Sequence, residues 1–326
     1  MKKPLFLAKK SLGQNFLRSK GALQKIVEAA DLKMCDVVLE AGPGEGVLTE
    51  ELLKRAGKVI AVEKDDRLIP FLSQKFSSDI SSGKLNLFNL DVLDFPPSGY
   101  TLVPSGYKLV ANLPYYITGQ FLKKFLQNVP PPSKMVLLLQ KEVAKRIIAN
   151  DGKNSILSIS VKAYGEPKYI ETVPAGAFSP APKVDSAIIL IDKISKNFFT
   201  EIKSVQPVSF LTGTVRSFAL ADSGGKSLAK LLKVASHPRR RESRLYDNGV
   251  DSRIRGNDRK RNLNLNEEKF FEIVKKGFSH KRKLLFSNLE IPKEEAEKIS
   301  AELNIPLKAR AEDLSLEEWG NLATRV

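Results

Sequence analysis

The sequence predicts an α/β protein, with a Rossmann-like, doubly wound sheet followed by a smaller C-terminal helical domain. Three observations predict this. Residues 37–46 run from an apolar segment into an acid and then alternate three glycines with other residues, which is typical of a buried strand, a tight turn and a helix start. Apolar strand-like runs then alternate with helical patterns up to about residue 191. From 265 onward, the apolar residues follow helical spacing only.

Apolar periodicity places each element of the sheet domain. A helix is expected over Lys20–Ala30. The expected strands are, in chain order, 36–41, 58–63, 85–91, 107–111 and 135–139. Between and after them, helices are expected at 46–56, 68–76, 121–126 and 143–148. Two later apolar runs, 156–164 and 187–191, read as an antiparallel pair of strands at the sheet edge.

The totals favour a soluble, cytoplasmic protein of more than one domain. The chain has 326 residues, of which 42% are hydrophobic and 28% charged. No apolar run approaches the ~20 residues of a membrane span, and Leu5–Ala8 is too short for a signal-peptide core. A single cysteine, Cys35, excludes an intrachain disulfide and suits a reducing compartment. His237 and His280 are far apart, so no metal site is expected.

Positive charge is concentrated in one part of the chain. The net charge is +16, and residues 191–289 hold 22 Lys and Arg against 10 Asp and Glu. Such a surplus favours a polyanionic partner, most often nucleic acid, over a merely solubilising surface or an anionic membrane. Residues 196–264 include basic clusters with few apolar residues, and we expect a disordered insertion there. The expected domains are therefore 1–195 and 265–326, on either side of this insertion.

The glycine turn suggests a particular cofactor. Gly42 and Gly44 permit torsions closed to other residues and let a ligand approach backbone N–H groups. The pattern is G-x-G-x-G rather than the dinucleotide G-x-G-x-x-G, and Pro43 removes a donor that a pyrophosphate would use. A cationic sulfonium nucleoside, S-adenosylmethionine, fits a site edged with carboxylates such as Glu40. The alternative is a glycine turn with no ligand.

Two further acids end the next strands on the same edge of the sheet. Glu63 follows Gly42 by 21 residues, where a doubly wound fold places the carboxylate that binds ribose hydroxyls. Asp91 ends the third strand and is positioned to accept the exocyclic amine of an adenine, with Asp94 as the competing candidate. A solvated acid at the end of a strand is the alternative for each.

The tetrapeptide Asn112–Tyr115 carries the predicted chemistry. An exocyclic amine on a base or an amide is a poor nucleophile because its lone pair is delocalised. The Asn112 amide oxygen and the Leu113 carbonyl can accept its N–H bonds and aim the lone pair at a methyl group. Pro114 fixes the turn, and Tyr115 offers a stacking face worth ~1–3 kcal/mol. Alignment with an activated methyl donor supplies much of the rate. The alternative is a simple strand-ending turn.

Taken in order, these motifs resemble the ribosomal RNA adenine N6,N6-dimethyltransferase family, whose sheet is of the class I methyltransferase type. The resemblance covers roughly 1–195 and 265–326. The matching segments are Gly13–Leu17, Glu40–Gly46, Asn112–Tyr115, Leu139–Val143, Phe178–Ser186, Lys281–Lys283 and Arg310–Leu314.

The resemblance implies a site and a substrate. The implied substrate is a pair of adjacent adenosines near the 3′ end of small-subunit rRNA, each methylated twice. Separately from the resemblance, we expect a monomer. Tyr115 and Phe178 would sandwich the extruded base, although Phe178 also reads as a core aromatic. Lys281, Arg282 and Lys283 would contact phosphates or form a solvated face. S-adenosylmethionine would be bound by Gln14, Asn15, Leu17, Glu40, Gly42, Gly44, Glu63, Asp91 and Asn112.

Two departures from the family and two rival functions remain. About 60 extra residues separate the two domains, and Phe286 replaces a basic residue that usually follows the Lys281–Lys283 run.

One rival function is that of the antibiotic-resistance type of large-subunit rRNA adenine methyltransferase. The other is a non-catalytic RNA-binding assembly factor. Asn112-Leu113-Pro114, rather than an Asn-Ile-Pro form, and the 178–186 loop favour the small-subunit enzyme.

Overall fold

The computed structural model describes residues 6–96, 106–127, 130–200, 202–203, 262–263 and 265–326. These residues belong to one compact unit made of residues 1–205 and 261–326. Most of the predicted 196–264 insertion lies outside the described residues. The division into domains at 195 and 265 therefore stays a prediction. No helix of the described residues is long and apolar enough to cross a membrane.

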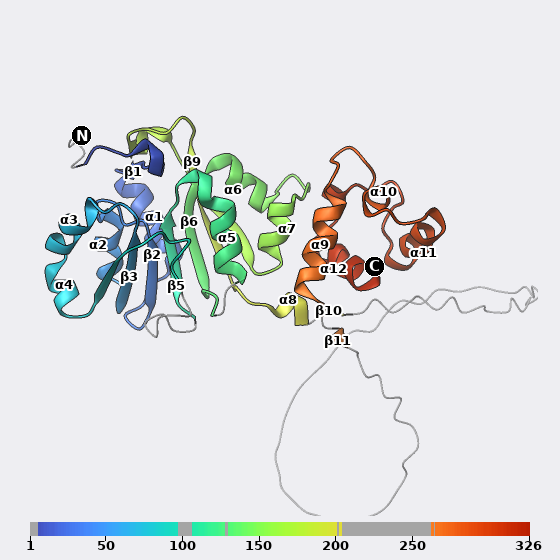
Figure 1. The fold of residues 1–326 in the computed structure, drawn as a ribbon, viewed down its shortest axis with the longest axis horizontal. Helices are drawn as coiled ribbons and strands as arrows, with labels where there is room; N and C mark the ends of the chain where they lie inside the picture. Colours follow the sequence, from blue (N-terminus) through green and yellow to red (C-terminus); the bar gives the residue numbers. More distant parts are fainter. Residues whose placement is uncertain (1–5, 97–105, 128–129, 201, 204–261, 264) are drawn as a thin grey trace, which may run out of the picture. The chain divides into compact units, whose positions relative to one another are not determined.

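A seven-stranded sheet forms the centre of this unit (Figure 1), in the order β4-β3-β2-β5-β6-β9-β7. The first five strands in this order are parallel, and β9 runs antiparallel to both β6 and β7. The strands are β2 (Val37–Ala41), β3 (Lys58–Glu63), β4 (Leu85–Asn89), β5 (Lys108–Asn112), β6 (Lys134–Gln140), β7 (Glu166–Val173) and β9 (Ser186–Asp192). The predicted doubly wound sheet is confirmed.

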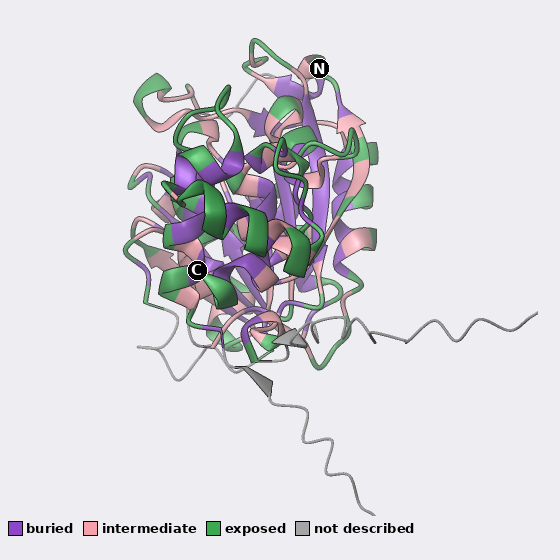
Figure 2. Cartoon of the chain, turned by 90° about the vertical axis from the view of Figure 1, so that its right-hand side faces the viewer, coloured by how far each residue is buried: buried purple, intermediate pink, exposed green. Residues whose placement is uncertain are grey.

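Helices cover both faces of the sheet, and alternation along each strand gives each face its own core. Val38, Val59 and Val110 face α1 (Lys20–Ala30), α2 (Val47–Leu53) and α3 (Leu68–Lys75). Leu39, Ile60 and Leu109 lie in the other core with α5 (Thr118–Gln127), α6 (Lys141–Ile148) and α7 (Ile156–Lys162). A short α4 (Ser77–Ser81) packs against β4. Figure 2 shows the buried strands in purple and the exposed helix faces in green.

The expected strand over 156–164 is wrong, because Ile156–Lys162 form helix α7 and Ala163 caps its C-terminus. Ser155 caps this helix: its hydroxyl accepts from the Ser158 N–H and the Ser158 hydroxyl accepts from the Ser155 N–H, a reciprocal capping box. The helix start was not predicted because the β-branched residues of the segment favour a strand. On the outer side, β9 pairs instead with β7, whose alternating charges and Pro167 suit an edge strand.

A set of shorter elements completes the sheet region. β1 (Phe16–Leu17) pairs antiparallel with β8 (Phe178–Ser179), and β10 (Ile202–Lys203) pairs with β11 (Asn262–Leu263). The remaining short elements are η1 (Lys10–Leu12), η3 (Tyr115–Ile117), η4 (Ala175–Ala177) and α8 (Asn197–Thr200).

The C-terminal residues form the expected helical cluster around Trp319, which is fully buried. The Trp319 ring lies where a side chain on Gly277 would be, so α9 (Glu267–Gly277) and α12 (Leu316–Arg325) approach closely there. Hydrogen bonds join this cluster to the sheet region: the Asn154 N–H donates to the Glu312 carbonyl at 2.8 Å, and Asn154 Nδ2 to the Leu314 carbonyl at 2.9 Å. The elements are α9 (Glu267–Gly277), α10 (Leu285–Leu289), α11 (Lys293–Leu303), η5 (Ala311–Asp313) and α12 (Leu316–Arg325).

Candidate active site

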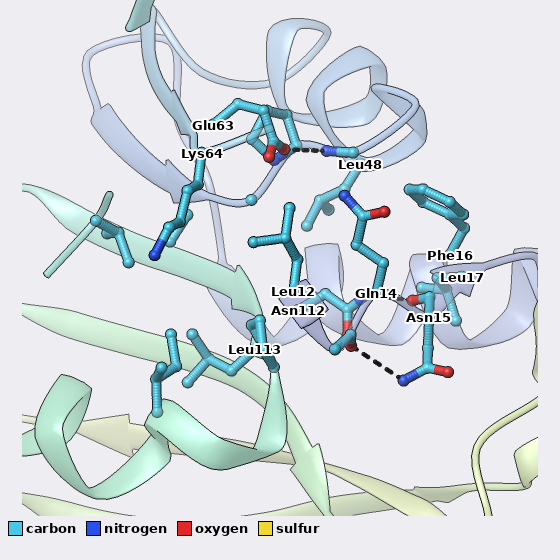
Figure 3. A pocket seen from close by; sticks show the side chains of 18 of the residues that line it. Leu12, Gln14, Asn15, Phe16, Leu17, Leu48, Glu63, Lys64, Asn112 and Leu113 are labelled. Carbon is cyan, nitrogen blue, oxygen red and sulfur yellow. Dashed lines mark hydrogen bonds between the residues drawn. The ribbon is translucent and has the colours of Figure 1, made fainter. Parts of the chain in front are cut away.

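A pocket opens at the carboxyl edge of the sheet, where β2, β3 and β5 end (Figure 3). It is lined by most of the residues that the sequence singled out, which come from separate parts of the chain. The predicted residues that line it are Gln14, Asn15, Leu17, Gly42, Gly44, Glu63, Asp91, Asn112, Leu113, Pro114, Tyr115 and Phe178. This edge is where open α/β sheets bind ligands.

The glycine turn has the conformation that its sequence requires. Gly44 and Gly46 have φ of 58° and 73°, in the left-handed region that favours glycine. A side chain at Gly44 would meet the Phe16 ring at 3.1 Å, and one at Gly46 would meet the Phe76 ring at 2.6 Å. The turn is therefore packed from both sides, and its backbone forms one wall of the pocket.

Glu63 holds the glycine turn as well as facing the pocket. Its Oε2 accepts from the Gly44 N–H at 3.0 Å, and its Oε1 accepts from the Asp65 N–H at 2.8 Å. Burial raises the pKa of the Glu63 carboxyl, and these two N–H groups oppose that effect. Each carboxylate oxygen has a second lone pair, so the group retains capacity to accept from hydroxyls.

The Asp91 carboxylate lines the pocket and also binds Lys64, for which the sequence predicted no role. Lys64 Nζ lies 2.6 Å from Asp91 Oδ2, and the Leu93 N–H donates to Oδ1 at 2.8 Å. Burial alone would raise the pKa of Asp91, but these two donors outweigh it and lower the pKa. The carboxyl is therefore ionised and positioned at the rim of the pocket.

Glu40 is the one predicted cofactor ligand that does not line the pocket. Its side chain is completely buried in β2, and neither of its carboxylate oxygens has a hydrogen-bond partner among the described residues. Burial raises its pKa to about 8, with Glu63 adding to the effect and Thr49 opposing it. Burial thus favours the neutral form of this carboxyl, which lies behind the pocket wall rather than in it.

Asn112 ends β5 with its amide inside the pocket. Its Nδ2 donates to the Asn15 carbonyl oxygen at 3.1 Å (Figure 3). This bond commits the nitrogen and leaves Oδ1 as the end that can accept. The next residue is also fixed, because the Leu113 N–H donates to the Leu138 carbonyl at 3.0 Å. The tetrapeptide is therefore held at both its side chain and its backbone.

Tyr115 and Phe178 line the same pocket from different elements. The Tyr115 hydroxyl lies 2.8 Å from Ser186 Oγ, which is buried at the start of β9. Phe178 begins β8 and pairs with Leu17 of β1. Phe178 is 5% exposed and belongs to a hydrophobic core, as the alternative reading expected, and its predicted stacking on a base stays a prediction.

The N-terminal segment forms another wall of the pocket. It is held by hydrogen bonds of Gln14 and Arg18 that no local sequence pattern predicts. Gln14 donates from Nε2 to Asp65 Oδ2 at 2.7 Å, so its side chain binds the protein itself. Arg18 pairs with Glu45 through two hydrogen bonds of 2.6 and 2.9 Å. Charged residues spaced this way in a sequence are usually solvated, and only the fold brings them together.

Lys281, Arg282 and Lys283 do not line the pocket. They are exposed between α9 and α10. Phe286, which replaces a basic residue of the family pattern, is buried in α10 and cannot serve as a surface phosphate contact. Within the described residues no group of His, Cys, Asp and Glu is arranged to hold a metal ion.

The strand order, together with a glycine-turn pocket at the carboxyl edge, defines the class I methyltransferase fold. A family model described as "Ribosomal RNA adenine dimethylase" matches residues 5–215. The chain therefore belongs to this family, which confirms the resemblance read from its motifs.

Curated relatives agree with this assignment. A ribosomal RNA small subunit methyltransferase A from Dehalococcoides mccartyi is 52% identical over 184 residues, which are 56% of this chain and 62% of the relative. The matched part thus spans less than two thirds of that relative's length. Proteins of the same name from Acaryochloris marina and Geobacillus kaustophilus are 31% and 33% identical over 98% of this chain, covering 97% and 92% of their own lengths.

Two solved structures share the fold. The 23S rRNA methyltransferase ErmE aligns with a TM-score of 0.63 at 23% identity, over 95% of this chain and 99% of its own. A dimethyladenosine transferase from Plasmodium falciparum aligns with a TM-score of 0.65 at 22% identity, over 94% of this chain and 95% of its own.

Proposed function

We propose that this protein is an S-adenosylmethionine-dependent rRNA adenine N6,N6-dimethyltransferase. Its substrate would be the two adjacent adenosines near the 3′ end of small-subunit rRNA, within the immature small subunit. The observation that carries the proposal is the position of Asn112: its amide shares one pocket with the glycine turn and with the Glu63 and Asp91 carboxylates. We further propose that it acts in the cytoplasm as a monomer.

The residues of the pocket fit the cofactor. Glu63 offers carboxylate oxygens for ribose hydroxyls, and Asp91 offers an acceptor for the adenine amine. Gly42 has φ of 71°, and a side chain there would come within 3.9 Å of the Asn112 carbonyl oxygen. When bound, S-adenosylmethionine supplies an electrophilic methyl group at a sulfonium centre. Asn15 and Leu17 complete the wall on the N-terminal side.

The groups around the pocket mouth suit an adenine amine as the acceptor of the methyl group. The Asn112 amide oxygen and the Leu113 carbonyl accept the two N–H bonds, which turns the nitrogen lone pair out of conjugation. Tyr115 and Phe178 stack on the flipped base and offset the few kcal/mol that flipping costs. Asn112 adds no charge of its own beside the cationic centre. Rate is gained through alignment, so no strong base is required.

The names of the relatives favour the small subunit over the large one. Relatives aligned along nearly the whole chain are named as small-subunit methyltransferases. The structure titled as a 23S rRNA methyltransferase shares the fold at only 23% identity. A non-catalytic assembly factor would have no need of Asn112 and Tyr115, yet both line the pocket.

Methyl transfer from labelled S-adenosylmethionine tests the proposal. Undermethylated small and large ribosomal subunits are incubated separately with the protein, and modified nucleotides are mapped. We expect dimethylation of two adjacent adenosines in the small subunit. Modification of large-subunit rRNA, or no modification at all, would refute this function.

A further inference from the structure

We propose that Asp65 is a positioning residue for methyl transfer, because it fixes the N-terminal segment whose Asn15 carbonyl orients the Asn112 amide. This inference rests on the proposed function, since it concerns the same pocket. Asp65 lies just after β3 and is not among the residues that line the pocket. It would act only through the residues that it holds.

The first step is the orientation of the amide. The two ends of an asparagine amide have nearly the same shape but opposite hydrogen-bonding character. Asn112 Nδ2 donates to the Asn15 carbonyl at 3.1 Å, so Oδ1 is the end presented to a target amine. If that carbonyl moved away, the reversed amide would present N–H groups to an amine that also donates. The reversed state cannot accept the substrate's N–H.

The second step is what holds the Asn15 carbonyl in place. Gln14, its neighbour in the chain, donates from Nε2 to Asp65 Oδ2 at 2.7 Å. Lys9 Nζ lies 3.1 Å from Asp65 Oδ1, and the Lys9 N–H donates to Gln14 Oε1 at 2.8 Å. Lys9, Gln14 and Asp65 therefore form a closed ring of hydrogen bonds that fixes the peptide next to Asn15.

The third step is the strength and rigidity of this anchor. The Asp65 side chain is completely buried, and Arg67 adds two more bonds, from Nε to Oδ1 at 2.9 Å and from Nη2 to Oδ2 at 2.6 Å. The Arg67 guanidinium, with Gln14 and Lys9, holds the pKa of Asp65 well below its usual range. Asp65 also donates its N–H to Glu63 Oε1, so the anchor is tied to the cofactor wall.

Asp65→Asn isolates the charge with almost no change of volume. One carboxylate oxygen becomes an NH₂ group facing donors from Gln14, Lys9 or Arg67, so at least one bond of the ring is broken. The neighbouring Asp66 is a matched control: its side chain is 78% exposed and lies 3.4 Å from Lys9 Nζ. Asp66→Asn removes the same charge one residue away and weakens an exposed contact of Lys9 Nζ, but it leaves the Asp65 carboxylate and its bonds to Lys9 and Gln14 in place.

The experiment measures steady-state methylation of undermethylated small subunits at saturating cofactor, with S-adenosylhomocysteine binding by calorimetry and thermal melting of each variant. For Asp65→Asn we expect kcat to fall roughly 10-fold or more while KM for the subunit stays within about two-fold. Asp66→Asn keeps wild-type kcat. Lys9→Met lowers kcat less, and adds little to Asp65→Asn because both act on one ring.

The outcomes separate the two proposals. Wild-type kcat in Asp65→Asn would overturn the inference, as would a defect that appears only in S-adenosylhomocysteine affinity and vanishes at saturating cofactor. If Asp65→Asn does not fold, Lys9→Met and Gln14→Leu decide, and unchanged kcat in both would also overturn it. A wild-type protein that transfers no methyl group would instead refute the proposed function.

Discussion

Arg18 and Glu45 form a two-point ion pair across the wall of the pocket, with Nη1 2.6 Å from Oε2 and Nη2 2.9 Å from Oε1. Glu45 is almost completely buried, whereas Arg18 keeps about a quarter of its side chain exposed. The pair joins the end of β1 to the glycine turn. It is thus the second ionic anchor of the N-terminal segment, beside the ring at Asp65.

Removal of the Arg18 side chain should destabilise the protein. Arg18→Ala leaves a buried carboxylate without its bidentate partner, so the free energy of unfolding should fall by about 3 kcal/mol. Urea denaturation measures this. Lys25→Ala, which breaks an exposed pair with Glu28, is the control and should leave the midpoint unchanged. Equal midpoints for Arg18→Ala and wild type would show that the pair contributes nothing.

Asn112→Ala should abolish methyl transfer without loss of RNA binding. The alanine has no oxygen to accept the amine's N–H bond, so we expect kcat to fall by roughly 10³-fold. Binding of small subunits should be unchanged, because the substitution leaves the exposed Lys281–Lys283 run, the expected phosphate contact, in place. Asn197→Ala, at an exposed position on α8, is the control. Transfer at the wild-type rate would remove Asn112 from the mechanism.

Glu40 should make stability depend on pH in an unusual direction. Burial raises its pKa from 4.5 to about 8, so between these values the folded state binds a proton that the unfolded chain has released. Stability from this group is complete below pH 4.5 and disappears as the pH rises through 8. The full change is at most about 5 kcal/mol.

Glu40→Gln should therefore gain stability relative to wild type as the pH rises from about 5 to about 8.5. Chemical denaturation at several pH values gives the difference. Glu272→Gln, on the exposed side of α9, serves as the control and should show no such trend. A difference that does not vary with pH would mean that Glu40 titrates normally.

Residues 204–261 should be replaceable by a short turn. Ile202 pairs with Leu263 and Lys203 with Asn262, so the two ends of the segment lie side by side in one antiparallel ladder. A two-residue Asn-Gly connection between Lys203 and Asn262 fits such a ladder. We expect cooperative unfolding and retained methyl transfer, with weaker RNA binding and a shallower salt dependence, since the replaced segment is rich in Lys and Arg. Failure of this variant to fold would contradict the prediction.

Neutralising the exposed Lys281–Lys283 run should weaken binding to RNA. Replacing all three by alanine should weaken subunit binding and reduce the slope of log affinity against log salt by about 1 for each phosphate that is no longer neutralised. Lys293 and Lys298, exposed on α11, are controls within the same helical cluster. An unchanged slope would leave this run as solvated surface.

Local patterns predicted most of the sheet because its strands are nearly continuous apolar runs. Helix α1 and strand β3 begin and end at the predicted residues, Lys20–Ala30 and Lys58–Glu63. The failure at 156–164 has a local cause: Ile156, Ile159 and Val161 favour strands, but the Ser155 cap and tertiary packing select a helix. The edge strand β7 is half-polar and carried no apolar run to find.

The pocket was predicted where spacing along the chain reflects spacing in the fold. Gly42, Glu63, Asp91 and Asn112 all end or closely follow strands whose carboxyl ends meet at one edge, so their order in the sequence was sufficient. Asp65 and Glu45 were missed because their partners lie in the N-terminal segment, and no local pattern records an interaction between residues so far apart. Glu40 was taken for a cofactor ligand for a different reason: an acid beside a glycine turn is usually exposed, but β2 buries this one behind the wall.

The pairing of Phe16 with Ser179 and of Leu17 with Phe178 has a consequence for synthesis of the chain. Phe16 and Leu17 are translated early, but their partners in β8 are translated only after six of the seven strands of the sheet. A nascent chain cannot close its binding pocket until that late loop has emerged. The part of the pocket wall that Phe178 forms is therefore absent from any nascent chain that ends before β8.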